Sequence, residues 1–236
     1  MKKQWFEQFF AEDYCKVYAP SIEKRTSIEV DFIKGITGPA NGQKMLDLCC
    51  GYGRHVSALA NEGYTVCGLD LSPHMVRLAG ALPVVLADMR KMPFRDESFD
   101  LVYNLFTSFG YFEDKKDDEK AMSEASRVLR SQGTFVIDLR NPVRPVPEKI
   151  DYMVDDVRVS ECYRTSNGII RGERQIQYPS GEIRQLPSAV RLYPLECLAQ
   201  MLDGAGLRVA KVMGDVDGSL YSDKSPRLVV QAVKSA

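Results

Sequence analysis

The stretch that decides the fold is Lys44–Asp70, KMLDLCCGYGRHVSALANEGYTVCGLD. Its first residues form a short apolar run that ends in the turn GYG at 51–53, where residues without a Cβ are favoured. Apolar residues at helical spacing follow from Arg54, and a second apolar run ends at Asp70. This order predicts the first half of a nucleotide-binding βαβ unit. At such a turn the helix N-terminus attracts an anion, and the terminal acid accepts hydrogen bonds from ribose hydroxyls.

The turn departs from the dinucleotide fingerprint G-x-G-x-x-G, because Val56 stands where the third glycine would be. This argues against a nicotinamide or flavin cofactor. The run DLCCGYG from Asp47 to Gly53 instead resembles motif I of the class I S-adenosylmethionine-dependent methyltransferases, usually written D-x-G-C-G-x-G. Cys49 replaces the first glycine of that motif. The resemblance implies that the loop contacts the methionine part of the cofactor and that Asp70 holds its ribose.

The resemblance covers residues 44 to about 140. The family pattern D-x-S-x-x-M is met in full from Asp70 to Met75, and Ser72 and Pro73 suit the N-cap and first position of a helix. Later runs resemble the family's L-P-F, S-F-D-x-V and V-L-K-P-G-G: MPF at 92–94, SFDLV at 98–102 and VLRSQGT at 128–134. The implied fold is α/β, a doubly wound, seven-stranded, mostly parallel sheet, with its last two strands (207–212 and 228–233) antiparallel to each other.

The resemblance also implies a set of contacts with S-adenosylmethionine. Asp88, after a third strand, would bind the adenine amino group, although a helix cap is its alternative role. Met89 would offer a backbone N–H to the ring, and Asn104, after the fourth strand, is a further expected contact. The full expected set is Tyr18, Arg25, Asp47, Gly51, Gly53, Asp70, Leu71, Met75, Asp88, Met89 and Asn104.

The segment before the first strand, 1–43, is predicted to be a helical lid. Residues 4–19 carry an apolar stripe typical of an amphipathic helix, and 21–36 suit a second helix. This segment either packs on the domain or covers the cofactor. In the second case Tyr14 or Tyr18 would reach the methionine end and Arg25 its carboxylate.

A proline-rich run at 141–147 marks a boundary in the chain. Three alternating stretches then follow, 154–164, 169–178 and 182–192, separated by the hairpin signals NG and SG. We therefore expect an antiparallel β insertion after the fifth strand, at 142–192 and over the substrate site, with 44–141 and 193–236 as the cofactor-binding core. The insertion's six arginines either form a basic face for an anionic substrate or point outward into solvent: Arg158, Arg164, Arg171, Arg174, Arg184 and Arg191.

The acceptor class is suggested by the fourth loop and the N-terminus. The loop reads NLFT, not the N/D-P-P-Y/F of the DNA and glutamine amino-methyltransferases. Together with WFEQFFAEDY near the N-terminus and NLFTSFGYF at 104–112, it is similar to a bacterial subgroup related to aminosugar and small-amine N-methyltransferases. We expect substrate contacts from residues of the predicted lid, loops and insertion: Tyr14, Tyr111, Arg191, Tyr193 and Tyr221.

Composition argues against several other classes of protein. A net charge of −1 argues against a broad nucleic-acid surface. No stretch approaches the length of a membrane span, so a cytoplasmic protein without membrane contact is expected. The six cysteines form no C-x-x-C pair, so neither a metal site nor a disulfide framework is indicated.

The sequence thus predicts methyl transfer from S-adenosylmethionine to a small-molecule nitrogen or oxygen. No residue stands out as a general base. Three alternatives remain: an RNA methyltransferase, a protein methyltransferase and a non-catalytic cofactor-binding scaffold. A homodimer is also left open.

Overall fold

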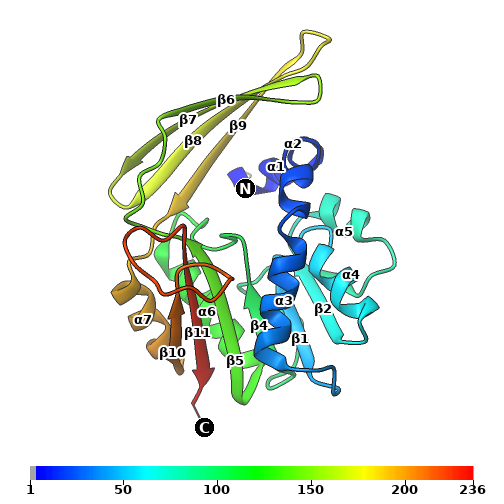
Figure 1. The fold of residues 1–236 in the computed structure, drawn as a ribbon, viewed down its shortest axis with the longest axis vertical. Helices are drawn as coiled ribbons and strands as arrows, with labels where there is room; N and C mark the ends of the chain where they lie inside the picture. Colours follow the sequence, from blue (N-terminus) through cyan, green and yellow to red (C-terminus); the bar gives the residue numbers. More distant parts are fainter. Residues whose placement is uncertain (1–3, 236) are drawn as a thin grey trace.

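The computed structural model describes residues 4–235, and seven strands form its main sheet. These strands are β1 (Lys44–Leu48), β2 (Thr65–Asp70), β3 (Val84–Leu86), β4 (Phe99–Asn104), β5 (Leu129–Arg140), β10 (Leu207–Met213) and β11 (Arg227–Lys234). Their order is β10-β11-β5-β4-β1-β2-β3 (Figure 1). β1 to β5 pair in parallel, whereas β11 is antiparallel to both β5 and β10. The predicted class I methyltransferase fold is confirmed.

Helices cover both faces of this sheet because successive strand residues point to opposite sides. On β1, Met45 packs with α3 (Thr26–Thr37) and α4 (Arg54–Asn61). Its neighbour Leu46 packs on the other side, in the cluster that includes α6 (Lys115–Val128) and α7 (Leu195–Gly204). Helix α5 (Pro73–Ala79) begins as predicted, since the Ser72 hydroxyl accepts a hydrogen bond from Met75 N at 3.3 Å. The carboxyl ends of β1, β2 and β4 are therefore left for a ligand.

A second sheet lies apart from the first, with the order β6-β7-β8-β9 (Figure 1). Its strands are β6 (Lys149–Val154), β7 (Val157–Ser166), β8 (Ile169–Gln177) and β9 (Ile183–Arg191), all antiparallel. The insertion is confirmed, but the prediction of three strands is wrong. β6 is an edge strand whose residues are all exposed or half-buried, so it carries little of the apolar signal that marks a strand.

The insertion's arginines divide by strand face. Arg158, Arg164 and Arg171 are exposed, as expected for solvated side chains. Arg174 points the other way and is buried. Three of the arginines thus share the exposed face of β7 and β8, where Arg164 pairs with Arg171, while Arg174 faces the N-terminal helices.

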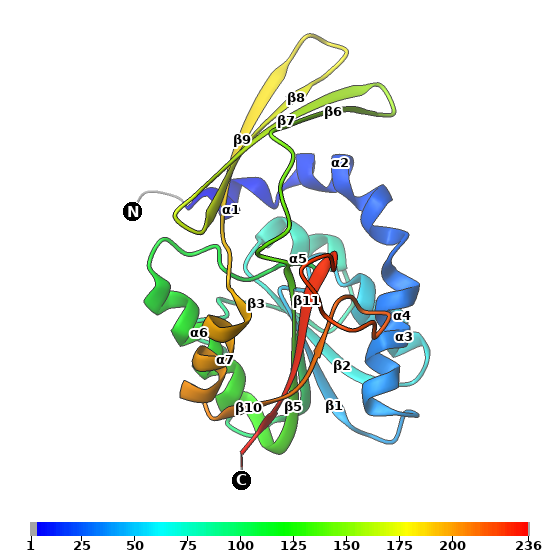
Figure 2. The same ribbon diagram turned by 60° about the vertical axis from the view of Figure 1, so that its left-hand side comes forward.

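The N-terminal helices lie between the two sheets (Figures 1 and 2). They are α1 (Trp5–Phe9) and α2 (Glu12–Glu23), so the single helix predicted at 4–19 is wrong. Pro20, which falls between the helices predicted at 4–19 and 21–36, lies inside α2. Helix α3, within the predicted lid, packs Val30 and Ile33 on the main sheet instead.

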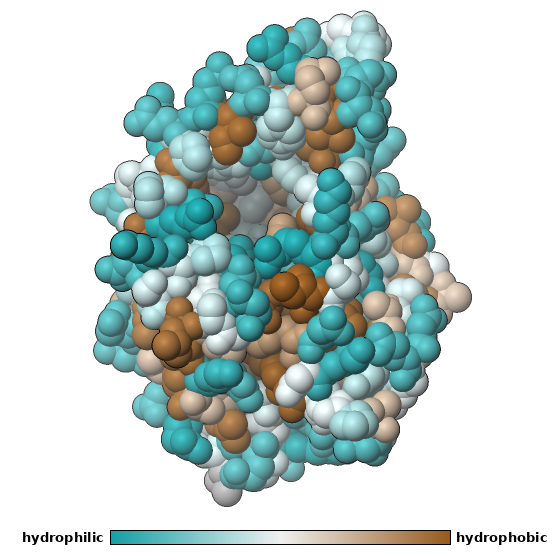
Figure 3. Space-filling model, in the orientation of Figure 1, coloured by the Kyte–Doolittle hydropathy of each residue, from teal (hydrophilic) through white to brown (hydrophobic). Residues whose placement is uncertain are grey.

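Within residues 4–235, every helix is too short or too polar to span a bilayer. Figure 3 shows a hollow on one face of the molecule, between the antiparallel sheet and the main body.

Candidate functional site

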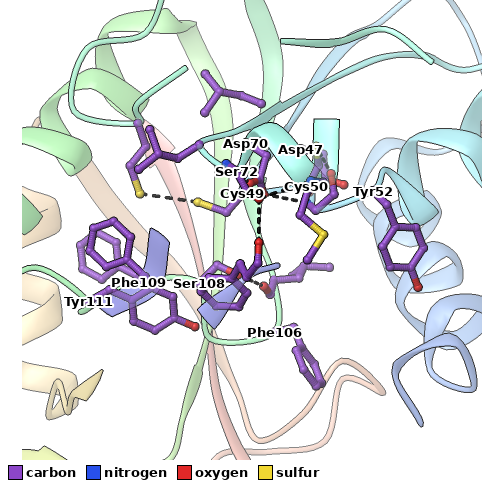
Figure 4. A pocket seen from close by; sticks show the side chains of 18 of the residues that line it. Asp47, Cys49, Cys50, Tyr52, Asp70, Ser72, Phe106, Ser108, Phe109 and Tyr111 are labelled. Atoms are coloured by element: carbon purple, nitrogen blue, oxygen red, sulfur yellow. Dashed lines mark hydrogen bonds between the residues drawn. The ribbon is translucent and has the colours of Figure 1, made fainter. Parts of the chain in front are cut away.

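A cavity of about 470 Å³ lies at the carboxyl edge of the main sheet. In Figure 4, Tyr52 lies on one side, Phe109 and Tyr111 lie opposite it, and Cys49, Asp70 and Phe106 lie between them. The N-terminal helices supply the cover through side chains at positions 6, 7, 10, 14 and 22. The cavity is thus formed by the glycine turn together with two segments far from it in the chain, the N-terminal helices and the loop after β4.

The glycine turn adopts a left-handed backbone at several positions. Gly51 and Gly53 have φ of 59° and 80°, and Gly53 is the N-cap residue of α4. A Cβ at Gly53 would lie 3.0 Å from the Leu82 side chain, so strain and space both favour glycine there. Cys49 has φ of 62° although it carries a side chain, and its thiol lies 3.6 Å from the Met89 sulfur. Burial raises the pKa of the Cys49 thiol well above 9, so it stays protonated.

Asp70 is fixed by the backbone around it. Its Oδ2 accepts from Gly51 N at 2.8 Å and its Oδ1 accepts from Ser72 N at 2.8 Å. Burial raises the pKa of Asp70 above 3.8, although the backbone N–H donors of Ser72 and Gly51 oppose the shift. Each oxygen keeps a further lone pair, which suits a carboxylate that accepts from two ribose hydroxyls.

Asp88 lies at the cavity, where an adenine contact is expected, but the helix-cap alternative is wrong because a turn and not a helix follows it. It lines the cavity, and its Oδ1 accepts from Arg90 N at 2.8 Å in a local turn. The Arg90 guanidinium also donates to Asp88 Oδ2, from Nη2 at 2.6 Å. Met89 follows it in the lining.

A buried charged cluster at one side of the cavity was not predicted. His55 lies between Asp47 and Glu29, with its Nδ1 3.4 Å from Asp47 Oδ2 and its Nε2 3.0 Å from Glu29 Oε2. Arg54 Nη1 is 2.5 Å from the same Glu29 oxygen. Burial lowers the pKa of His55, but the two carboxylates outweigh this and raise it above 6.5. Burial likewise raises the pKa of Glu29, but His55 and Arg54 reverse this and lower it from 4.5 to about 2.

This cluster joins α3 to the glycine turn. Arg54 and His55 line the cavity, and Arg54 is the only arginine or lysine among the described lining residues. Glu29 is 26 residues away from His55, so no local pattern pointed to the pair.

Seven of the predicted cofactor residues line the cavity: Asp47, Gly51, Asp70, Leu71, Met75, Asp88 and Met89. The other four lie outside the lining: Tyr18, Arg25, Gly53 and Asn104. Tyr18 donates a hydrogen bond to Glu161 of the antiparallel sheet. Arg25 forms ion pairs with Glu29 at 3.2 Å and Asp215 at 3.0 Å and does not line the cavity. The arginine that does line the cavity is Arg54.

Asn104 lies just behind the lining and is 1% exposed. Its Nδ2 donates to Leu48 O at 2.9 Å, while its Oδ1 has no hydrogen-bond partner within residues 4–235. An unpaired buried acceptor is costly unless a ligand supplies a donor. The ammonium of a bound methionine group is such a donor, so this residue and the Asp70 cradle fit S-adenosylmethionine.

Of the predicted substrate residues, Tyr14 and Tyr111 line the cavity and three do not. Tyr193 Oη donates to Asp118 Oδ2 at 2.7 Å, and Arg191 Nε is 3.4 Å from the same oxygen. Tyr221 Oη donates to Asn141 Oδ1 at 3.1 Å.

Arg191 still bears on the cavity, through the backbone of the loop. Its N donates to Gly110 O at 2.8 Å, and a Cβ at Gly110 would lie 2.6 Å from Arg191 O. Gly110, with φ of 84°, therefore allows β9 to hold the loop that lines the cavity.

The loop after β4 contains a left-handed turn that the sequence did not predict. Phe106 and Thr107 follow β4 with φ of 61° and 55°, which is rare for bulky and β-branched residues. Asp138, at the end of β5, holds them by accepting from Phe106 N at 2.8 Å and, through its own carbonyl, from Thr107 N at 2.9 Å. The strained turn directs Phe106 into the lining.

Much of the cavity lining is aromatic. Its rings come from the N-terminal segment and the loop after β4: Phe6, Phe10, Tyr14, Phe106, Phe109, Tyr111 and Phe112. Burial raises the pKa of the Tyr14 and Tyr111 hydroxyls far above 10. Both are neutral at physiological pH and neither is a ready base.

Residues 46–137 match a family model described as a methyltransferase domain. Over 214 residues the chain is 25% identical to the putative methyltransferase YqeM of Bacillus subtilis, covering 81% of this chain and 84% of that protein. Two solved structures are similar in fold. They are the CcbJ methyltransferase from Streptomyces caelestis (TM-score 0.79, 20% identity, 90% of each chain) and the sugar N-methyltransferase KedS8 from a Streptoalloteichus species (TM-score 0.73, 21% identity, 93% of each chain).

Proposed function

We propose that this S-adenosylmethionine-dependent methyltransferase, which has the class I fold, methylates a nitrogen or oxygen atom of a small-molecule acceptor. The observation that carries the proposal is the aromatic part of the cavity lining, which the N-terminal segment and the loop after β4 build together. It offers a small, largely apolar chamber beside the cofactor cradle. Such a chamber suits one small organic molecule better than a polynucleotide or a protein surface.

In this proposal the residues act by orienting the reactants and excluding water. The bound cofactor supplies an electrophilic methyl group on a positively charged sulfur. Asp70 and the glycine turn hold its ribose and methionine ends, while Phe10, Tyr14 and Tyr111 enclose the acceptor. An amine that binds in its neutral form needs no base, which agrees with two tyrosines that stay protonated. The sugar N-methyltransferase of similar fold adds support for an amine.

The test is product formation from pools of possible acceptors. Purified protein with S-adenosylmethionine is incubated with amino sugars and small amines, with hydroxy acids and phenols, with total RNA, and with protein extract. S-Adenosylhomocysteine is then quantified by mass spectrometry. We expect turnover with a small-molecule pool, and the Phe10→Ala variant should lose most of it. Turnover with RNA or protein alone would overturn the proposal, and cofactor binding without turnover on any pool would favour the scaffold alternative.

A further inference from the structure

The N-terminal helices and the antiparallel sheet share a hydrophobic cluster of their own. Phe9 of α1 and Val17 of α2 pack with four buried residues of the sheet: Val157, Val159, Ile176 and Leu186. The two large clusters of the main sheet contain none of these six. We call the unit formed by residues 5–23 and 149–191 the cap.

The centre of the cap is a buried carboxylate, Glu161 of β7, which is 5% exposed. Its Oε1 accepts hydrogen bonds from Tyr18 of α2, from Tyr152 at 2.8 Å and from Arg174 Nε at 2.7 Å. Its Oε2 accepts from Tyr163. Hydrogen bonds from these donors offset the cost of burying the Glu161 carboxylate.

Arg174 extends this network to the helices. Its guanidinium lies 4.6 Å from the ring centre of Phe9 and 4.6 Å from that of Tyr18. One aromatic ring belongs to α1 and the other to α2, so the cation from β8 binds both helices through their π faces. At the outer end of α2, Asp13 accepts from Tyr178 and from Arg184 Nη1 at 2.9 Å.

The cap reaches the cofactor cavity only through its helices. Tyr14 packs between Phe10 and Tyr18, with ring centres 4.9 Å and 5.1 Å away, and both Phe10 and Tyr14 line the cavity. Among the described lining residues none comes from strands β6 to β9. Glu161 thus lies one aromatic ring, Tyr18, behind the residues that cover the cofactor.

From this arrangement we infer that Glu161 is a positioning residue for the methyl-transfer site: through Tyr18 and Arg174 it makes the helices and the antiparallel sheet close over the cofactor as one body. The inference rests on the cofactor site and not on the acceptor. Trp5, whose Nε1 donates to Tyr111 O at 3.3 Å, marks where the closed cap meets the loop after β4.

The experiment uses the full chain with S-adenosylhomocysteine as the probe. Hydrogen exchange is followed by mass spectrometry in peptides from α2 and from β7 and β8, with and without the probe, and the dissociation rate is measured by stopped flow. In the native protein we expect the probe to slow exchange in α2 and in the two strands together, although the strands do not line the cavity. In Tyr18→Phe and Glu161→Gln the strands should lose this response, and the dissociation rate should rise about tenfold, as for loss of a hydrogen bond to a charged group.

Tyr163→Phe is the matched comparison, because the bonds that it removes, to Glu161 and from Arg174 Nη2 at 3.2 Å, both lie within the antiparallel sheet. It should raise the dissociation rate much less than Tyr18→Phe does. Equal effects of the two tyrosine variants, protection confined to α2, or unchanged dissociation in a folded Tyr18→Phe protein would each overturn the inference. If Glu161→Gln does not fold, Tyr18→Phe decides. Failure of the native protein to bind the probe would instead refute the cofactor site itself.

Discussion

Asp70 is the residue on which the cavity most depends. Its two oxygens already hold the backbone of the glycine turn and of the α5 cap, so the carboxylate is in place before any ligand arrives. A preorganised acceptor loses little freedom on binding, which supports the proposed role of Asp70 as the acceptor for two ribose hydroxyls.

Asp70→Ala should therefore weaken S-adenosylmethionine binding at least about 30-fold, as expected for the loss of hydrogen bonds to a charged group. Titration calorimetry measures the effect. Asp203→Ala, at an exposed position on α7, is the control and should bind as the native protein does. Equal affinities for all three proteins would refute the ribose role.

The cluster of His55 with Asp47 and Glu29 should make stability depend on pH. The folded pKa of His55 lies above 6.5, so its contribution is complete below about pH 6.5 and is lost as the pH rises through the folded value. The Glu29 pKa is lowered to about 2, so its contribution is complete above 4.5 and is lost as the pH falls toward 2.

The free energy of unfolding lost in His55→Gln should thus be larger at pH 6 than at pH 9. Urea denaturation at the two pH values gives the difference. His74→Gln changes the protein's other histidine and serves as the control. A loss that is the same at both pH values would show that His55 acts by packing and not by charge.

At the scale of elements, Ser72 connects α5 with the chain between α1 and α2. Its hydroxyl caps α5 by accepting from Met75 N and donates to Phe10 O at 2.7 Å. The Ser72 side chain therefore caps the N-terminus of a core helix and also anchors the N-terminal segment that lines the cavity.

Ser72→Ala should cost about 2 kcal/mol of unfolding free energy, about 1 for the cap and about 1 for the second bond. Urea denaturation measures it. Ser123→Ala, at an exposed serine that bonds only within its own helix, should stay within about 0.5 kcal/mol of the native protein. A Ser72→Ala protein as stable as this control would contradict the double role.

The elements that the sequence predicted well are those whose evidence is local. Apolar runs in the sequence predict the strands of the main sheet, and the acids Asp70 and Asp88 stand at or just after the ends of two of these runs. The run at 128–134, which resembles the family's V-L-K-P-G-G, gave no sign that β5 already begins at Leu129, where pairing with β4 starts. Phe106 and Thr107 gave no signal at all, because neither residue type favours a left-handed backbone.

The site residues that were missed are joined over long distances in the chain. Glu29 reaches His55 from another helix, and Tyr18 reaches Glu161 across 143 residues. Tyr18 and Arg191 were singled out, but their partners lie in the cap and on α6, which no spacing rule connects to them. Periodicity assigns a side chain to a face and leaves its partner open.

For the whole molecule, we propose that the main sheet binds the cofactor and the cap covers it. The cap's hydrophobic cluster should then influence cofactor binding from a distance. Ile176 is 0% exposed in that cluster, whereas Ile183 on the next strand is 51% exposed.

Ile176→Ala should weaken S-adenosylhomocysteine binding severalfold, because a core truncation of this kind costs about 2–4 kcal/mol and would loosen α1 and α2. Ile183→Ala makes the same chemical change on the outer face and should leave affinity unchanged. Calorimetry on both variants provides the comparison. Native affinity in a folded Ile176→Ala protein would show that the helices hold their place without the sheet.

The same pairing of α2 with β7 has a consequence during synthesis on the ribosome. The two helices are translated early, yet the sheet that covers their apolar face follows well over 100 residues later, as the Tyr18–Glu161 separation of 143 shows. At roughly 5–20 residues per second, that face waits on the order of ten seconds or more for its partner. Nascent chains stalled before β7 should therefore recruit holding chaperones through Phe9 and Val17, and complete chains should release them.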